Sequence, residues 1–510
     1  MTLFATARAI IGAATIIVAP ATLAPTPLFA QVAPAPIPTR PPDRVIQGAI
    51  TRADHQSYKD APFEVPTGTM RLVVAFDYDT RDQKTVIDLG LRDQHGFRGA
   101  SGGNKASFTI AESDATPSYL PGRIDPGIWH LSLAVPNIRT GVTAHWTAKI
   151  WFLKAPEASS LPATVIDRGP GWYRGDLHLH TAHSDGSCES QSGKRVPCPL
   201  FLTLETAAAR GLDFVAVTEH NTISHLNALR EDQPYFDRML LIPGREITTF
   251  YGHFNIFGVT EPIDYRIVPN GTVTFNSIAD RVHKLGGIVS INHPALPSGE
   301  ACMGCGWTMA GVDLARADAI EVANGGTIAA LGGRADGPWS GIPFWLDALA
   351  GSHPVTAIGG SDNHEGTARK EIGGTVGRPT TVVYADGLSQ AHILTGIARG
   401  RVFVDIAGDR QSLLDLHLRS SNASASMGGL LRRRAGEPLV ALIDAKASPG
   451  SRVELLAGKD IVVTRALTEG PHVEVPIDLP PGRAIVRIVV RAVDDRLLLL
   501  GNAIRVDTAR

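Results

Sequence analysis

Hydrophobic and polar positions alternate with a period of two in the first part of the chain. Ile87, Leu89 and Leu91 alternate with polar or small residues, and the same alternation runs over residues 145–152. This period is typical of β-strands with one buried face, and clusters of Gly, Pro, Asp and Asn separate the runs. The pattern predicts an N-terminal all-β sandwich-like domain over residues 43–165.

The period changes near residue 171. Short apolar runs now alternate with longer segments of helical pattern, such as residues 200–210 and 277–285. The apolar runs cover residues 213–218, 287–291, 318–322 and 355–360. This βαβα alternation predicts an α/β domain with a parallel sheet, either a barrel or a doubly wound sheet, over residues 172–410.

From residue 411 the period of two returns. Leu414, Leu416 and Leu418 alternate with Asp415 and His417. We expect a second all-β, sandwich-like domain over residues 411–510, and we find no long-period internal repeat. The predicted fold is therefore an α/β body flanked by β domains on both sides.

The first 30 residues have the pattern of a secretory signal peptide. Arg8 is their only charged residue, residues 10–19 are apolar, and small residues follow up to Ala30. Cleavage is expected after Ala30, with Ala24 as the alternative, and an uncleaved anchor is the other interpretation. The apolar run is shorter than the roughly 20 residues of a membrane span, so no span is expected after cleavage.

The segment that follows, residues 31–42, has five prolines and is interpreted as a semi-rigid linker. A cleaved signal would deliver the protein to the periplasm or the extracellular space, where disulfides form. The predicted location is therefore outside the cytoplasm.

Composition narrows the function classes. The 510 residues are 44% hydrophobic and 19% charged, enough apolar residues to bury a core and too few charges for a disordered chain. Lys and Arg number 48 against 50 Asp and Glu, which argues against nucleic acid as the main partner. A soluble enzyme for a small-molecule substrate, with accessory modules, is the expected class.

The chemistry is concentrated in the middle of the chain. His178 and His180 form a His-x-His pair, with Asp185 shortly after them. On a strand, residues i and i+2 point to the same side, so both imidazoles can reach one ion. The alternative is a pair of surface histidines, and a His-x-His pair alone does not decide between the two.

The same arrangement then recurs, because several apolar runs end in a residue that can bind a metal. These residues are Glu219 and His220 after 214–218, Glu246 after 240–244, His253 within 252–258, His293 after 288–291, and Asp362 and His364 after 357–360. Active sites of parallel α/β folds lie at the carboxyl ends of strands, so these side chains are expected to converge. Unpaired buried imidazoles and carboxylates would be costly, and metal binding removes that cost.

Imidazole and carboxylate ligands without thiolate suit zinc, manganese or iron(II). Without Glu219, nine such residues remain and exceed the four ligands of one tetrahedral ion, so we expect two or three divalent ions, with Glu246 as a bridging carboxylate. The implied reaction is hydrolysis by a metal-bound hydroxide. Asp362 or Glu219 could move the proton.

These motifs, in this order over residues 172–410, resemble the PHP (polymerase and histidinol phosphatase) superfamily. The resemblance implies a distorted seven-stranded β/α barrel, a (β/α)7 barrel with two or three metals at the carboxyl ends of its strands. It also implies how the ligands divide among three sites. The implied sites are His178, His180, Glu246 and Asp362; Glu246, His253 and His293; and Asp185, His220 and His364.

The layout of β module, barrel and β module resembles the CehA/McbA-type metallohydrolases within that superfamily, as do residues 63–68, 115–122 and 321–325. That group includes carbamate and ester hydrolases, whereas other superfamily members cleave phosphomonoesters. The first hypothesis is a phosphoesterase, the second a carboxyl-ester or carbamate hydrolase, and the third a non-catalytic surface-binding protein. The complete ligand set argues against the third.

Other residues near these motifs have two interpretations each. Arg245 and Arg369 are candidate clamps for a substrate anion, and structural ion pairs are the alternative. Cys188–Cys198 and Cys302–Cys305 are the favoured disulfides, each within a loop that follows a metal motif, and a cross-loop pairing is the alternative. His183, His225, His283, His353 and His392 match no ligand position of the superfamily.

Overall fold

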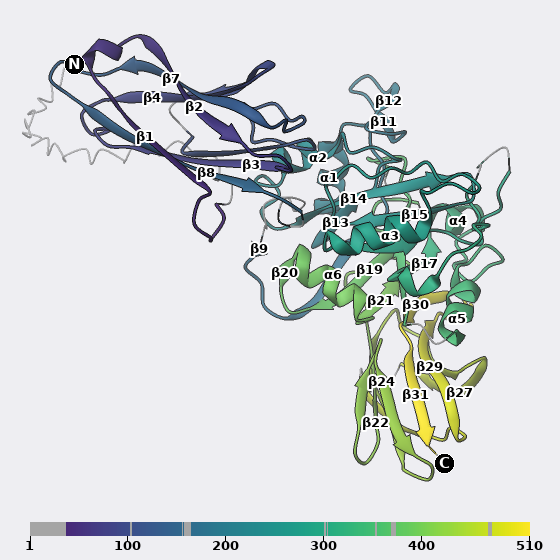
Figure 1. The fold of residues 1–510 in the computed structure, drawn as a ribbon. Coiled ribbons are helices and arrows are strands. Elements are labelled where there is room, and N and C mark those ends of the chain that lie inside the picture. The colour runs from purple at the N-terminus through teal and green to yellow at the C-terminus, as the bar shows by residue number, and fades with distance from the viewer. Residues whose placement is uncertain are drawn as a thin grey trace, which may run out of the picture.

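The computed structural model describes residues 37–102, 105–155, 157, 165–299, 302, 304–351, 354–368, 374–467 and 472–509. The predicted signal peptide and the first part of the linker lie outside these residues. The chain is mostly β, with the described α-helices gathered in its central part (Figure 1).

The N-terminal unit consists of two antiparallel sheets, with strand orders β1-β8-β3-β6 and β2-β7-β4-β5. Its strands are β1 (Arg44–Ile50), β2 (Ser57–Val65), β3 (Arg71–Tyr78), β4 (Val86–Asp93), β5 (Gly96–Ser101), β6 (Ser107–Ala111), β7 (Gly127–Asn137) and β8 (Ala144–Leu153). Alternate residues of both sheets, among them Leu89, Trp129 and Ile150, form one buried core. The period of two in the sequence corresponds to this inward-facing set.

The central unit is built on a mixed sheet in the order β18-β17-β16-β15-β14-β13-β10-β19-β21. These strands are β10 (Gly171–Asp176), β13 (Phe214–Val217), β14 (Leu240–Thr249), β15 (Gly252–Phe257), β16 (Ile288–Ile291), β17 (Ala319–Asn324), β18 (Thr356–Gly360), β19 (Thr380–Ala385) and β21 (Val402–Asp405). The helices are α1 (Leu200–Ala209), α2 (Leu226–Asp232), α3 (Phe275–Lys284), α4 (Gly325–Ala330), α5 (Ile342–Ala350) and α6 (Gln390–Ala398). Short pairs are formed by β11 (Ser187–Glu189) with β12 (Arg195–Pro197) and by β9 (Val165–Ile166) with β20 (Leu388–Ser389).

The expected alternation of strand and helix is interrupted at β15. β10, β13 and β14 are parallel, as are β16, β17 and β18, but β15 pairs antiparallel with both β14 and β16. Only Phe250 and Tyr251 connect β14 to β15, and a parallel pair needs a crossover of about a dozen residues or more. The central unit is thus a mixed α/β unit, not a regular βα repeat.

The sheet curves so that β18 approaches β19 and β21 without a backbone ladder to either. The backbone N–H of Gly359 donates to Thr381 Oγ1 at 2.8 Å. Asn502 joins Ala357 of β18 to Val402 of β21, donating from Nδ2 to both carbonyls at 2.9 Å. Side chains, and not strand pairing, connect this end of the sheet.

The C-terminal part continues the central sheet beyond residue 411. β21 pairs with β30 (Leu497–Gly501), which continues through β29 (Gly482–Arg491) and β26 (Arg452–Ala457) to β27 (Asp460–Ala466), while β31 (Ile504–Ala509) pairs with β29 and with β24 (Leu430–Arg434). A second sheet contains β23 (Ser424–Ser426), β22 (Leu413–Arg419), β25 (Leu439–Lys446) and β28 (His472–Ile477). The two sheets enclose a core that includes Leu416, Ile443 and Ile488. This part is therefore joined to the central unit by a shared sheet.

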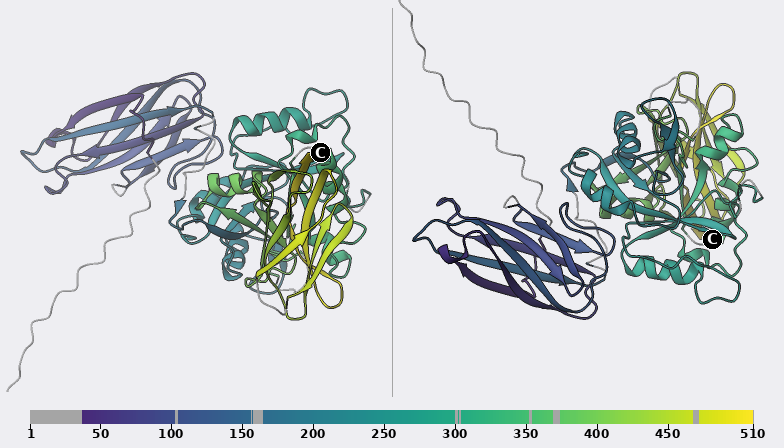
Figure 2. Two further views of the ribbon diagram at one scale, coloured as in Figure 1. Left: turned by 90° about the horizontal axis from the view of Figure 1, so that it is seen from below. Right: turned by 90° about the horizontal axis from the view of Figure 1, so that it is seen from above.

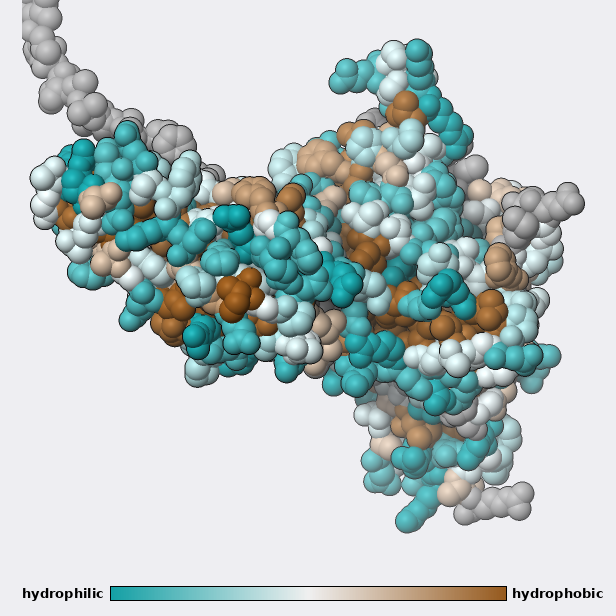
Figure 3. Space-filling view, turned by 45° about the horizontal axis from the view of Figure 1, so that its top comes forward, coloured by the Kyte–Doolittle hydropathy of each residue, from teal (hydrophilic) through white to brown (hydrophobic). Residues whose placement is uncertain are grey.

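The N-terminal sandwich lies beside the central unit and contacts it at one end (Figures 2 and 3). A buried ion-pair network crosses this contact: Asp114, which follows β6, pairs with Arg71 of β3 at 2.7 Å and with Arg230 of α2. The side chain of Asn227 accepts a hydrogen bond from the backbone N–H of Ala115 at 3.0 Å. Burial raises the pKa of Asp114, but the two guanidinium groups outweigh it and hold the pKa well below its usual range.

The described cysteines form two disulfides, Cys188–Cys198 with Cα atoms 4.9 Å apart and Cys302–Cys305 with Cα atoms 5.6 Å apart. These are the pairs that the sequence favours, and both separations are ordinary for disulfides. Among the described residues, no helix is both long and apolar enough to cross a membrane.

Candidate metal centre

Nine predicted ligands project from the carboxyl ends of the central strands or from strands near those ends. His178 and His180 follow β10, and His220 follows β13. Glu246 lies within β14, His253 is the second residue of β15, and His293 follows β16. Asp362 and His364 follow β18, and Asp185 lies in the loop before β11. The sheet order brings these ends together, as expected for an α/β site.

Glu246 is the centre of this cluster. Its Oε1 lies 3.3 Å from His178 Nε2, 3.4 Å from His253 Nδ1 and 3.4 Å from His293 Nε2. Its Oε2 lies 2.8 Å from His220 Nδ1. The side chain is 1% exposed, so one buried carboxylate faces imidazoles from four different elements. This is the arrangement expected of a bridging carboxylate.

Three groups of side chains could each hold a metal ion, their ligand atoms lying within 4.8 Å of one another. The groups are His180, Asp185, His220 and His364; His178, Glu246 and His293; and His178, His180 and Asp362. They contain eight of the nine predicted ligands, divided differently from the division that the resemblance implies. His180 joins Asp185, His220 and His364 in the first group, and His253 belongs to none of the three although it lies next to Glu246.

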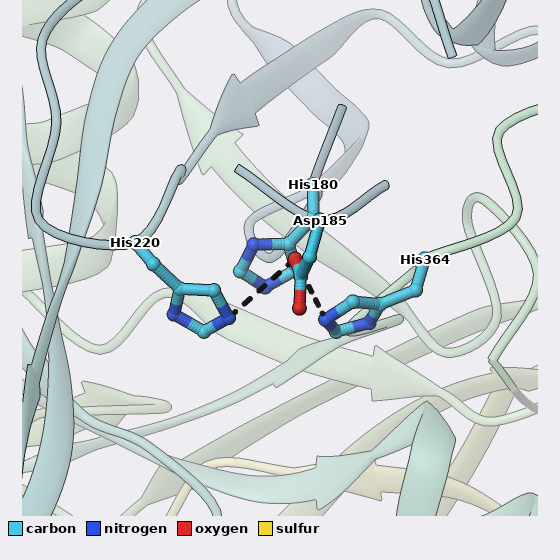
Figure 4. Close-up of side chains that lie close together, drawn as sticks. All are labelled: His180, Asp185, His220 and His364. Atoms are coloured by element: carbon cyan, nitrogen blue, oxygen red, sulfur yellow. Dashed lines mark ion pairs between the residues drawn. The ribbon is translucent and has the colours of Figure 1, made fainter. Parts of the chain in front are cut away.

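The first group, called the outer group below, faces solvent more than the others. Asp185 lies between two imidazoles, with Oδ1 3.3 Å from His364 Nε2 and 3.7 Å from His220 Nε2 (Figure 4). The side chains of Asp185, His364 and His220 are 56%, 36% and 27% exposed, whereas His180 is fully buried. The second and third groups, called the inner groups, are more enclosed, so the cluster is exposed to solvent on the Asp185 side.

Electrostatic coupling within the cluster is strong. Burial raises the pKa of Asp185, but the hydrogen bond and charge of His364 lower it to about 2. Burial lowers the pKa of His364, and Asp185 and Asp362 raise it to about 9. Burial and the neighbouring imidazoles lower the pKa of His180 to about 4, so this side chain is neutral near pH 7 and can act as a ligand.

The buried nitrogens of the inner groups fit a divalent cation. His178 Nε2 has a carboxylate oxygen of Glu246 and one of Asp362 each at 3.3 Å, yet it makes no hydrogen bond, and His253 Nε2 has no hydrogen-bond partner either. A buried polar atom without a partner is costly. A positive ion between the nitrogen and the two oxygens would satisfy all three, and the donor set suits zinc, manganese or iron(II).

Glu219 points to a loop instead of to the other carboxylates. It is fully buried and accepts hydrogen bonds from the backbone N–H of Thr181, at 3.1 Å, and from the hydroxyl groups of Thr181 and Ser184. The hydroxyl of Ser184 in turn lies 3.5 Å from His180 Nδ1. Glu219 therefore contacts the loop that leads from His180 to Asp185.

The structure does not bring Arg245 into the cluster. Adjacent residues of a strand point to opposite faces, and Glu246 is the residue that faces the ligands. Arg245 is 3% exposed and donates to the carbonyl oxygen of Glu261 at 3.2 Å. Burial lowers its pKa to about 10. Arg369, the other predicted anion clamp, lies outside the described residues.

Three polar residues that the sequence did not assign to the site contact the ligands. Asn292 Nδ2 donates to Glu246 Oε1 at 2.9 Å. Glu321 Oε1 lies 3.0 Å from His178 Nδ1, and Asn324 Nδ2 donates to Asp362 at 3.1 Å. A signal for Glu321 and Asn324 exists in the sequence, because both interrupt or end an apolar strand that is predicted to be buried.

Both disulfide loops contact ligand residues. The β11–β12 hairpin, closed by Cys188–Cys198, donates from the backbone N–H of Ser187 to the carbonyl oxygen of His364 at 2.8 Å. The carbonyl oxygen of Cys305 lies 3.1 Å from His293 Nδ1. Because a carbonyl oxygen only accepts, His293 Nδ1 donates here and its Nε2 is left facing Glu246.

Three other described histidines of the central unit have partners outside the cluster. His225 is buried against the carbonyl oxygen of Gly244, and burial lowers its pKa to about 3. His283 contacts Asp318 at 2.8 Å, and His183 contacts Ser224 at 2.8 Å. None of these three belongs to the groups that could hold an ion.

No protein-family model and no curated protein matches the chain. A two-domain protein from Bacteroides vulgatus, containing a predicted PHP-like metal-dependent phosphoesterase, is 19% identical with a TM-score of 0.35 over 66% of this chain and 96% of its own. Fibronectin(III)-like modules of Clostridium thermocellum CbhA are 18% identical with a TM-score of 0.14, over 18% of this chain and 99% of theirs. Xylanase10C of Cellvibrio japonicus is 8% identical with a TM-score of 0.14, over 38% and 40% of the two chains.

Proposed function

We propose that the chain is an exported, multinuclear metal-dependent hydrolase of the PHP type, whose central unit corresponds to the seven-stranded barrel of that superfamily. The observation that carries this proposal is the convergence of five histidines and three carboxylates in three overlapping groups. Overlap through His178 and His180 places neighbouring ions close together, as in two-metal hydrolases. The predicted division into signal, linker, sandwich, barrel and C-terminal β domain is part of this proposal.

The outer group would hold one ion and the inner groups would hold one or two. Glu246 would be shared between neighbouring ions. Divalent ions bound there would lower the pKa of a coordinated water to about 7 and stabilise negative charge on the substrate. The half-exposed Asp185 and His364 border the open side, so they lie where a substrate would enter.

Asp362 is the better candidate for the proton transfer. Its Oδ1 lies 3.2 Å from His180 Nε2 within the cluster, and its side chain is 17% exposed. Glu219 is fully buried and accepts three hydrogen bonds from the 181–184 loop. We therefore propose that Asp362 moves a proton and that Glu219 holds the loop.

The proposed substrate bond is a phosphoester, with carboxyl esters and carbamates as the alternative that the secreted three-part layout favours. The test is to load one preparation of the full chain with Zn²⁺ or Mn²⁺ and to compare hydrolysis of an aryl phosphate, an aryl ester and an aryl carbamate. Turnover of the aryl phosphate supports the first choice. Exclusive turnover of the carbonyl substrates would replace it with the alternative.

A matched pair of variants tests the site in the same assay. His178→Ala removes an inner ligand and is expected to abolish turnover of every substrate. His417→Ala removes an imidazole paired with Asp415 in the C-terminal sheet and is expected to leave turnover unchanged. Retention of most activity by His178→Ala would refute the assignment of the centre.

A further inference from the structure

Strand β17 supplies a buried carboxylate next to the metal cluster. Glu321 is 2% exposed, and both of its oxygens have partners. Oε1 lies 3.0 Å from His178 Nδ1, and Oε2 accepts a hydrogen bond from the backbone N–H of His293 at 3.0 Å. One side chain thus contacts two of the proposed ligands, which follow different strands.

Contact with Glu321 defines which nitrogen of His178 faces the cluster. A carboxylate accepts hydrogen bonds, so Nδ1 carries the proton and donates to Oε1. Nε2 is then left toward Glu246 and Asp362, each 3.3 Å away. Metal-binding histidines commonly have such a partner on the second ring nitrogen, which fixes the tautomer and the ring orientation.

Asn324 links Glu321 to a further ligand. Its Nδ2 donates to Glu321 Oε2 and to Asp362 Oδ2, both at 3.1 Å, which uses both amide hydrogens. Its Oδ1 accepts from the backbone N–H of Thr327 and caps helix α4. The helix cap therefore fixes the amide in the orientation that holds the two carboxylates together.

The surrounding backbone is shaped for this contact. A Cβ atom at Gly360 would lie 2.5 Å from Glu321 Oε1 and 2.5 Å from the Cβ of His178, so only glycine leaves room for the pair. His293 has φ of +25°, a left-handed conformation that is unfavourable for a residue with a side chain. Its hydrogen bond to Glu321 stabilises that conformation.

We propose that Glu321 is a positioning residue of the metal centre, which sets how tightly the inner ion is held. It presents His178 Nε2 and fixes the backbone of His293, and both residues belong to the same inner group with Glu246. The inference rests on the proposed metal centre but not on which bond is cleaved.

The decisive variant is Glu321→Gln, which keeps the shape of the side chain and removes its charge. In one orientation of the new amide, its NH2 group faces two donors, the N–H groups of His293 and Asn324. In the other orientation it faces Nδ1 of His178 and favours the wrong tautomer. Neither orientation satisfies all three partners of Glu321.

The experiment titrates metal-free full chain with Zn²⁺ in competition with a chromophoric chelator, and records the visible absorption of the Co²⁺-loaded protein. Glu321→Gln is expected to weaken one ion by about 10- to 100-fold, the usual effect of losing such a partner. The affinity of the outer group, and its share of the Co²⁺ absorption, should stay as in the wild type. Wild-type affinity for every ion in Glu321→Gln would overturn the proposal.

Glu454→Gln is the matched control, because Glu454 is a buried glutamate of β26 that pairs with Arg452 and Arg491 and belongs to none of the groups that could hold an ion. It is expected to change neither titration nor absorption, so an equal loss of affinity in this control would also overturn the proposal. If Glu321→Gln does not fold, Asn324→Ala replaces it and is expected to weaken the same ion by about tenfold. Wild-type affinity in Asn324→Ala would then contradict the inference.

This test is independent of the substrate assay. A wild-type chain that binds its ions but cleaves no phosphate, ester or carbamate would refute the proposed function and leave the role of Glu321 intact. If the wild-type chain hydrolyses an aryl phosphate while Glu321→Gln binds every ion normally, the proposed function is supported and the role of Glu321 is refuted.

Discussion

His178 Nε2 and a carboxylate oxygen of Glu246 lie 3.3 Å apart in a buried environment, and no hydrogen bond joins them. In neutral His178 the proton is on Nδ1, where Glu321 accepts it, so the two facing atoms then both carry lone pairs. Such an arrangement is unfavourable unless a positive charge lies between them. That charge is either a metal ion or the second proton of a charged imidazole, because burial lowers the pKa of His178 but the three neighbouring carboxylates outweigh it and raise the pKa. The proposed metal centre follows from this relationship more directly than from any single motif.

The first prediction concerns Glu246 itself. Glu246→Gln removes the negative charge that four imidazoles share and puts a donor among them. Loss of a residue that only hydrogen-bonds to a metal ligand already lowers metal affinity or activity by about 10- to 100-fold. Because Glu246 is itself a proposed ligand, we expect activity to fall by more than about 100-fold. The measurements are the metal content of the variant and its turnover of the best substrate, and both should fall together. Normal metal content and normal activity would show that Glu246 is not a bridging ligand.

The second prediction concerns removal of metal. Ions that bind only the folded chain at about 100 times their dissociation constant add about 2.7 kcal/mol to its stability. For a unit of the size of the central unit, chelation should therefore lower the midpoint of its thermal unfolding by about 5–10 °C. Scanning calorimetry before and after chelation measures it, and restoring Zn²⁺ should reverse it. A midpoint that does not respond to either step would contradict the account.

The third prediction concerns the contact between the sandwich and the central unit. Asp114→Asn leaves Arg71 and Arg230 buried without their shared carboxylate, and breaking such a buried pair costs about 3–5 kcal/mol. We expect faster limited proteolysis between the two units and a larger radius of gyration in solution scattering. Asp264→Asn, which removes an exposed partner of Arg266, is the control and should change neither.

The fourth prediction is a pH effect at the end of helix α2. Burial, together with the charge of Glu231, raises the pKa of Asp232 to about 6. A carboxyl group whose pKa is higher in the folded state binds its proton more tightly there, so stability falls as the pH rises from about 4 to about 6. Asp232→Asn should therefore raise the melting temperature at pH 7 and have little effect at pH 4. A gain of equal size at both values would contradict this assignment.

More of the candidate site than of the fold could be predicted from the sequence. Ligand-type residues at strand ends are visible in the sequence, and eight of the nine lie in groups that could hold an ion. For Arg245 the sequence leaves an anion clamp and a structural ion pair open, and strand alternation places its side chain on the other face from Glu246. The position of Glu321 within an apolar strand marks it as unusual, but a single strand glutamate has no ligand spacing that would predict its contact with His178.

The topology depends on features that have no local pattern. The reversal at β15 follows from a connection of two residues, Phe250 and Tyr251, whose length becomes clear only once the ends of both strands are known. The pairing of β21 with β30 joins residues about a hundred positions apart, so the sequence alone suggested a separate C-terminal domain. The Asp114–Arg230 contact likewise joins two units that each have their own sequence pattern.

The central claim is that this cluster holds two or three divalent ions, and metal analysis of the purified full chain tests it most directly. Elemental analysis of protein produced with added zinc, manganese and iron should give two to three ions per chain, and clearly fewer in His178→Ala. The control His417→Ala should match the wild type. Less than one ion per wild-type chain would contradict the account.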